Sequence, residues 1–170
     1  TMAKMRRSYP SPEKEITVYK PFECVVWDMI GPFRTTSIGG SRYSHDGVDR
    51  AMNLRFVYPV TDASAETFVE VMQQFIVFVG QVPGEFVFKI MRADHGSNYT
   101  SKLVRKFLQR NGIRMQLSAV ATPHMIRRGE LNHAILNATM RAIMSFANAP
   151  RNTWALARKW AAVLNNFLAT

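Results

Sequence analysis

The sequence predicts an α/β fold in which a mixed sheet is flanked by helices. Short apolar or alternating runs predict strands near 22–28, 42–48, 55–60, 86–91 and 113–117. Longer stretches with apolar residues three and four apart predict helices near 63–78, 101–112, from 129 onward and 153–166. Strands come first and then alternate with helices, an order typical of a sheet with antiparallel and parallel neighbours. The 170 residues, 47% of them apolar, suffice for one domain with a core.

The first three predicted strands form one group. An apolar run from Phe22 to Trp27 stops at Asp28, and Gly31-Pro32 follows closely. Gly39-Gly40 is a turn signal, so 42–48 and 55–60 are expected to be antiparallel neighbours. The segment 42–48 is unusually polar for a strand, which weakens its assignment.

Helix caps and breakers delimit the middle of the chain. Asp62 or Ser64 can cap the first helix, and Pro83-Gly84 separates it from a buried strand that ends at Asp94. Ser101 can cap the next helix, which Gly112 ends. Residues 113–117 alternate apolar and polar side chains, as a strand does.

The last third is predicted to be an irregular segment, 119–128, followed by two helices. On a helix that starts near Gly129, steps of three and four place one polar stripe, made of Glu130, His133, Asn137 and Arg141. An adjacent face is expected to pack on the sheet; it comprises Leu131, Ile135, Ala138 and Ala142.

Charge is distributed unevenly along the chain. The net charge is +10, and residues 89–170 hold thirteen basic residues against only two acids, Asp94 and Glu130. Such a surface attracts polyanions, of which nucleic acid is the commonest, although an unspecific basic surface is the alternative. A single cysteine excludes an internal disulfide, and no apolar run is long enough to span a membrane.

Three carboxylates stand at positions where α/β sheets place their sites. Asp28 and Asp94 each close an apolar strand, and Glu130 opens a helix behind a basic loop. Three converging carboxylates repel one another unless a cation compensates them, so the arrangement predicts a divalent metal site. Oxygen ligands favour Mg²⁺ or Mn²⁺, and two such ions can promote phosphodiester chemistry. The separation of the last two acids alone is weak support, because Asp49 and Glu85 repeat it.

With these residues located, the chain resembles the catalytic core of retroelement integrases, most closely that of copia-type long-terminal-repeat retrotransposons. Trp27–Phe33 is similar to the family's first-aspartate motif, and Arg92–Tyr99 to its second. The approach to the third acid, Glu130, and the closing tryptophan-alanine helix are matched by further residues: Asn111-Gly112-Ile113, Ser118, Thr122-Pro123, Trp154, Ala157, Ala161 and Leu164-Asn165-Asn166.

The resemblance implies an RNase H-like fold and a polynucleotidyl transferase with an Asp-Asp-Glu triad, Asp28, Asp94 and Glu130, holding two Mg²⁺ or Mn²⁺ ions. It implies DNA as partner, both element ends and target, a homo-oligomer, and neither a membrane nor a small-molecule substrate. Residues 1–20 would be a linker after a zinc-binding module, and 21–170 the core. The family acts in the nucleus at integration and in a cytoplasmic particle before it.

Departures from the family pattern keep other functions open. His95 and Asn98 replace an asparagine and a glutamate, Ile126-Arg127 an asparagine-glycine pair, and Leu131 and His133 an arginine and an asparagine. An integrase-derived module that binds nucleic acid without catalysis is therefore an alternative, and a structure-specific nuclease is a further one.

Five side chains are predicted to contact DNA: Arg127, Arg128, His133, Asn137 and Arg141. The two arginines adjoin the third acid, where phosphate contact is expected. A plain solvated loop is the competing interpretation for the arginines, and a solvated helix position for His133. Trp154 and Trp160 are interpreted as core or subunit-contact residues, with base stacking as the alternative.

Overall fold

A five-stranded sheet forms the centre of the computed structural model, which describes residues 18–117 and 123–168. The strands lie in the order β3-β2-β1-β4-β5. The strands β1, β2 and β3 pair antiparallel, whereas β4 and β5 run parallel to β1, so the predicted mixed sheet is confirmed. The strands are β1 (Cys24–Ile30), β2 (Tyr43–Asp49), β3 (Arg55–Val60), β4 (Ile90–Ala93) and β5 (Arg114–Leu117).

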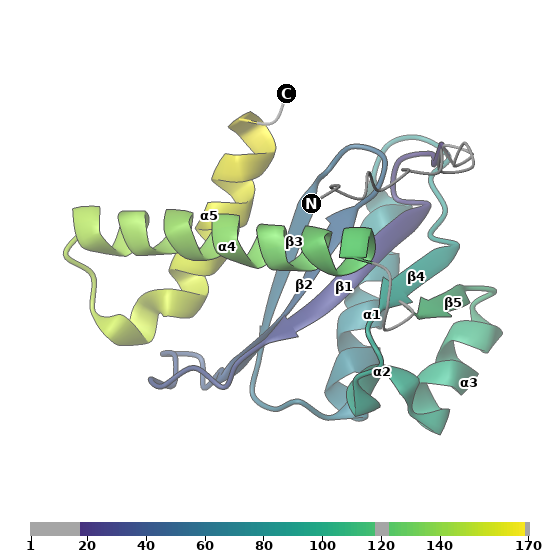
Figure 1. Cartoon of the computed structure of the whole chain (residues 1–170), viewed down its shortest axis with the longest axis horizontal. Helices are drawn as coiled ribbons and strands as arrows, with labels where there is room; N and C mark the ends of the chain where they lie inside the picture. The colour runs from purple at the N-terminus through teal and green to yellow at the C-terminus, as the bar shows by residue number, and fades with distance from the viewer. Residues whose placement is uncertain (1–17, 118–122, 169–170) are drawn as a thin grey trace, which may run out of the picture.

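Helices cover both faces of this sheet (Figure 1). They are α1 (Ala65–Gln81), α2 (Ser97–Thr100), α3 (Lys102–Arg110), α4 (Pro123–Phe146) and α5 (Trp154–Leu168), with a 3₁₀ turn, η1 (Arg151–Thr153), before the last. The helix α1 packs against α2 and α3, while α4 crosses α5 and contacts β1 and β2. Within the described residues, no helix is long and apolar enough to cross a membrane.

The larger core lies between the sheet and α1. Trp27 of β1 is 1% exposed and meets Phe68 and Phe75 of α1 edge to face, at ring-centroid distances of 6.0 and 5.3 Å. Residue spacings along α1 place its buried side chains on one face, and Ser64 caps the helix by accepting a hydrogen bond from the Thr67 N–H.

A second, smaller core joins α4 to α5. Leu136 is fully buried against Trp154 and Ala161, and the Trp154 ring stacks on Phe33 at 3.8 Å. Trp154 is thus a core residue, as expected, whereas Trp160 is 62% exposed. This second core fixes α4 and α5 relative to each other on the opposite side of the sheet from α1.

Among the boundaries that differ from the sequence expectation, three belong to elements next to predicted site residues. β1 continues two residues past Asp28, because β2 offers it backbone partners along that length. β4 begins at Ile90 rather than 86, although Phe88 is buried as expected. Pro123 begins α4, so the segment expected to be irregular up to 128 is helical from that residue on. Proline suits the first turn of a helix, where no N–H is required.

The prediction of which face of α4 packs on the rest of the protein was also wrong. Leu131 is 59% exposed, and Ala138 and Ala142 are exposed as well. The inward face instead carries Asn132, Leu136 and Met140. The physical reason is that α4 packs on α5 more than on the sheet, which rotates its buried stripe by about one residue. Residues 1–17 of the predicted linker and the loop 118–122 lie outside the described residues.

Candidate functional site

Asp28 lies on β1, and Asp94 directly follows the neighbouring parallel strand β4. The last printed pair of this register joins Val26 to Arg92, two residues before each aspartate, and the charge of Asp94 acts on Asp28. Asp28 Oδ1 accepts a hydrogen bond from the Met29 N–H at 2.8 Å. Burial raises the pKa of Asp28, and the charges of Asp94 and Asp46 raise it further, against the lowering effect of His133 and the Met29 N–H.

The loop after Asp94 is closely packed around its carboxylate. Asp94 Oδ1 accepts a hydrogen bond from the Gly96 N–H at 2.9 Å. A Cβ on residue 96 would lie 2.6 Å from Asn98 Oδ1 and 3.0 Å from Asp94 Oδ1, so any side chain here would force Asn98 and Asp94 to move. The sequence pattern of strand, acid and glycine thus corresponds to a loop that turns back on its own acid.

A fourth acid, Asp46, adjoins these two, and sequence reasoning missed it. The register of the antiparallel pair places Asp46 of β2 directly beside Asp28 of β1. Asp46 is 1% exposed and accepts hydrogen bonds from Ser44 Oγ at 2.6 Å and from the fully buried Arg158 of α5, whose Nε lies 3.2 Å from Asp46 Oδ2. The signal that could have revealed Asp46 was the polar character of the segment 42–48. This segment forms β2, which pairs with a strand on each side, so its polar side chains need partners.

The buried ion pair determines the charge state of Asp46. Complete burial works to raise its pKa, but the interactions with His133 and with the Arg158 guanidinium outweigh burial and hold the pKa below its usual value. Asp46 is therefore ionised at neutral pH. Removing either partner of such a pair leaves an uncompensated buried charge, which typically costs about 3–5 kcal/mol.

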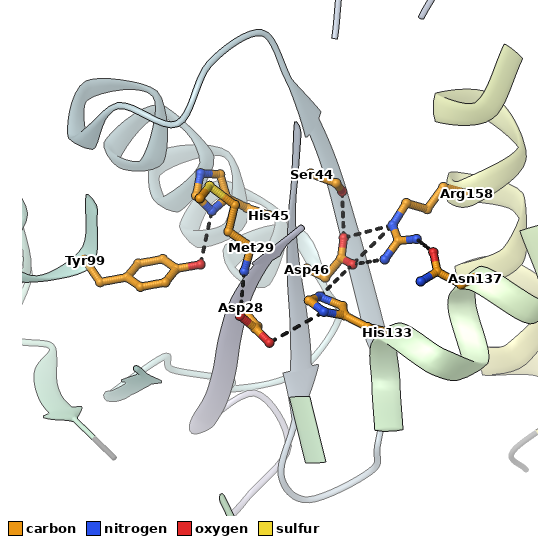
Figure 2. Close-up of polar contacts among 9 residues, drawn as sticks. All are labelled: Asp28, Met29, Ser44, His45, Asp46, Tyr99, His133, Asn137 and Arg158. Carbon is orange, nitrogen blue, oxygen red and sulfur yellow. Dashed lines mark hydrogen bonds and ion pairs between the residues drawn. The ribbon is translucent and has the colours of Figure 1, made fainter. Parts of the chain in front are cut away.

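His133 of α4 lies between Asp28 and Asp46, as Figure 2 shows. Its Nδ1 is 3.5 Å from Asp28 Oδ2, and its Nε2 is 3.2 Å from Asp46 Oδ2, an ion-pair distance outside hydrogen-bond geometry. One turn further along α4, Asn137 Oδ1 accepts a hydrogen bond from Arg158 Nη1 at 2.7 Å. These two predicted DNA-contacting residues thus make protein contacts here; their roles in DNA binding stay predictions.

The remaining predicted site residues are spread along α4. Glu130 and Arg141 are exposed, and Glu130 lies one turn before His133. Arg127 and Arg128 belong to the helical backbone of α4, but their side chains lie outside the described part of the structure. The structure thus brings Asp28 close to Asp94, and does not place Glu130 with them.

The residues around Asp28 and Asp94 partly fit a divalent cation. Asp28 and Asp94 are two carboxylates within electrostatic reach of each other, and the pKa of Asp28 is raised mainly by burial and further by the charge of Asp94. A hard cation would stabilise such a pair. In the ranges 18–117 and 123–168, however, no three His, Cys, Asp or Glu side chains form a group that could hold a metal ion. The assignment of Asp28, Asp94 and Glu130 as metal ligands therefore stays a prediction.

His45 of β2, next to Asp46 in the sequence, is a buried neutral histidine that contacts the segment after Asp94. His45 Nδ1 and Tyr99 Oη lie 3.3 Å apart, and burial is the main cause that lowers the pKa of His45 to about 4. Tyr99 belongs to α2, directly after the Asp94 loop, and Asn98 Nδ2 lies 3.9 Å from Met29 Sδ. These contacts tie the loop after Asp94 to β1 and β2.

The fold agrees with what a comparison with known families finds. Residues 18–123, more than half of the chain, match the model of the integrase core domain. The chain belongs to the integrase core domain family. The match includes Asp28 and Asp94 in the motifs quoted above, and it confirms the sequence-based expectation of an integrase core. The match ends before Glu130.

Relatives in retrotransposons agree with this membership. The chain is 26% identical over 153 residues to the truncated transposon Ty1-A Gag-Pol polyprotein and to the transposon Ty1-DR4 Gag-Pol polyprotein of Saccharomyces cerevisiae. The alignments cover 89% of this chain but only 13% and 9% of those polyproteins. The integrase core thus corresponds to a small part of much longer retrotransposon proteins.

Solved structures of integrases share the fold. The crystal structure of the BIV integrase catalytic core domain superposes with a TM-score of 0.64 at 15% identity, covering 84% of this chain and 82% of that one. The simian T-cell lymphotropic virus intasome, solved by cryo-electron microscopy with PP2A regulatory subunit B56 gamma, gives a TM-score of 0.68 at 16% identity, covering 91% and 54%. The predicted RNase H-like fold is therefore confirmed.

Proposed function

We propose that this integrase core is a polynucleotidyl transferase that joins the 3′ ends of retroelement DNA to target DNA. The observation that carries the proposal is the position of Asp28 on β1 and of Asp94 directly after the adjacent parallel strand β4, in a family-matched core. The strands β1 and β4 hold the two backbones rigidly, and the loop after Asp94 fixes its carboxylate. Rigid placement of carboxylates on sheet strands is what orientation-dependent phosphoryl chemistry requires.

Asp28, Asp94 and Glu130 are the proposed metal ligands, with two Mg²⁺ or Mn²⁺ ions as cofactors. When bound, such ions supply activation of the attacking oxygen and stabilisation of the leaving oxygen. The part of the protein's own residues is to bind and orient. Asp28 and Asp94 contribute from the sheet, and Glu130 contributes from the exposed surface of α4.

DNA, both element ends and target, is the proposed partner. The charge of residues 89–170 supports it, because their basic side chains can neutralise phosphates. Arg127, Arg128, His133, Asn137 and Arg141 are the proposed contacts. We propose action in the nucleus, preceded by a cytoplasmic particle.

A homo-oligomer is the proposed working form. It is supported by the exposed apolar face of α5, whose side chains follow helical spacing: Leu156, Trp160, Val163 and Leu164. Sedimentation velocity of the wild type and of Trp160→Glu tests this. A species larger than a monomer that the substitution dissociates supports the oligomer, and a monomeric wild type refutes it.

The substitution Glu130→Gln tests the enzymatic assignment. Strand joining is measured with a labelled element-end duplex and a target plasmid in Mg²⁺, and DNA binding by fluorescence anisotropy. We expect joining to be lost and binding to be retained. Glu85→Gln is the matched control, because Glu85 is also exposed but lies away from the sheet's central aspartates. Unchanged joining by Glu130→Gln would refute the assignment of the third ligand.

A nucleic-acid-binding module without catalysis is the second candidate. Two observations favour it: His133 contacts the Asp28 carboxylate, and Glu130 lies apart from the aspartates. Calorimetry with Mg²⁺ on the wild type and on Asp94→Asn separates the two candidates. Binding by the wild type that the substitution abolishes favours the enzyme, and a wild type that binds DNA but no Mg²⁺ favours the module.

A further inference from the structure

We propose that Asp46 and Arg158 are positioning residues that orient the Asp28 carboxylate through His133. This inference rests on the proposed function, because it concerns the use of Asp28 as a metal ligand. It assigns a role to two fully buried charged side chains that the family motifs do not include. They come from β2 and α5, and the chain of contacts from Arg158 to Asp28 crosses four secondary-structure elements (Figure 2).

The first step is the fixed position of Asp46. Both Asp46 and the Arg158 side chain are buried, and the guanidinium engages the carboxylate through Nε and Nη2. Ser44 Oγ donates to the second carboxylate oxygen at 2.6 Å. With both oxygens engaged and no solvent access, this carboxylate has one orientation.

The second step transmits this orientation to α4. Asp46 Oδ2 lies 3.2 Å from His133 Nε2, and Arg158 Nη1 donates to Asn137 on the next turn of the same helix. Two contacts one turn apart fix the rotation of a helix about its axis. The rotation of α4 also determines the direction in which Glu130 points, one turn before His133.

The third step reaches the candidate ligand. The His133 ring, 14% exposed, presents Nδ1 to Asp28 Oδ2 at 3.5 Å, while the Met29 N–H donates to Asp28 Oδ1. Asp28 is therefore contacted at both oxygens, and each oxygen retains a further lone pair for a cation. Partners behind a ligating carboxylate fix its orientation, and their loss typically weakens metal affinity about 10–100-fold.

Packing alone does not require charges at these two positions. Apolar side chains of similar volume can replace a buried ion pair without loss of stability, because both desolvation costs disappear. The double variant Asp46→Val/Arg158→Met therefore keeps the net charge and removes the anchor of His133. Valine also suits a central strand.

The decisive measurement is Mn²⁺ affinity by calorimetry, with Mn²⁺ as the only added ligand. We expect the folded double variant to bind Mn²⁺ at least about 10-fold more weakly than the wild type. Asp49→Asn is the matched control, because Asp49 is equally buried on β2 but caps the Phe22, Ala51 and Met52 N–H groups instead. It should lower the melting temperature and leave Mn²⁺ affinity unchanged.

A metal-free readout accompanies this titration. Crystal structures of the wild type and of the double variant should show the His133 ring displaced from Asp28 in the variant. An unmoved ring, or an Mn²⁺ affinity that stays equal or increases, overturns the positioning role even if the wild type joins DNA. If the double variant does not fold, His133→Ala replaces it in the Mn²⁺ titration with the same expected loss, because it removes the link to Asp28 and leaves the buried Asp46–Arg158 pair intact. A wild type that binds no Mn²⁺ overturns this inference together with the proposed function.

Discussion

The single substitution Arg158→Met tests the energetic weight of the buried ion pair. It leaves Asp46, which is 1% exposed, without its guanidinium partner, while Asn137 loses a donor. Breaking such a pair typically costs about 3–5 kcal/mol. Because Ser44 and His133 still contact Asp46, we expect the lower end, about 3 kcal/mol. For a chain of this size, that lowers the melting temperature by about 6–12 °C.

The pH dependence of this loss separates an electrostatic cause from a packing cause. The pKa of Asp46 is depressed in the folded protein, so the pair contributes stability above the unfolded-state pKa of about 4, and this contribution disappears as the pH falls through the folded-state pKa. The difference between wild type and Arg158→Met should therefore be large at pH 7 and smaller at pH 3, below the unfolded-state pKa.

Urea unfolding at the two pH values measures this difference. Lys159→Met, at the neighbouring exposed position, is the control and should change the free energy of unfolding by less than about 0.5 kcal/mol. Equal losses for the two variants would contradict the reasoning. So would a loss for Arg158→Met that is independent of pH, because it would assign the effect to lost packing of the arginine stem.

Three further predictions concern other parts of the molecule. Leu136→Ala should lower the free energy of unfolding by about 2–5 kcal/mol, since it opens a cavity between α4 and α5. Urea unfolding with an unchanged m-value measures this loss, and a loss below about 1 kcal/mol would contradict the packing described. Ser64→Ala should cost about 1 kcal/mol by removing the cap of α1, whereas Ser64→Asp should restore most of it in the same assay. Asp28→Asn should raise the melting temperature at pH 7. The pKa of Asp28 is raised in the folded protein, so its ionisation destabilises the folded state as the pH rises through that pKa. A melting temperature that falls at pH 7 would contradict this prediction.

The strands and two of the acids could be predicted because they depend on local sequence. The apolar run before Asp28 and the strand-acid-glycine order around Asp94 each specify a conformation within a few residues. Their proximity follows from the rule that parallel neighbours present the same ends at one edge of a sheet. The start of α4 could also have been predicted, because proline is a favourable first residue of a helix and Pro123 begins α4.

The network around Asp46 could not be predicted in the same way. Its partner on the sheet depends on the register of β1 and β2, and its counter-ion lies 112 residues away on α5. A polar residue in a strand signals only that some partner is needed. The inward face of α4 was missed for the same reason, since both α5 and the sheet determine which side of the helix is buried.

The long separation between Asp46 and Arg158 has a consequence for the order of folding. β1 and β2 are synthesised more than a hundred residues before the helix that supplies the counter-ion. Until α5 docks, the Asp46 carboxylate lacks its counter-ion and must stay hydrated, so the face of β2 that carries it keeps bound water. Contacts at such separation are also slow to form. We therefore expect the docking of α5 and the exclusion of water from Asp46 to occur together, late in folding. In a nascent chain that lacks α5, we expect Asp46 to remain hydrated.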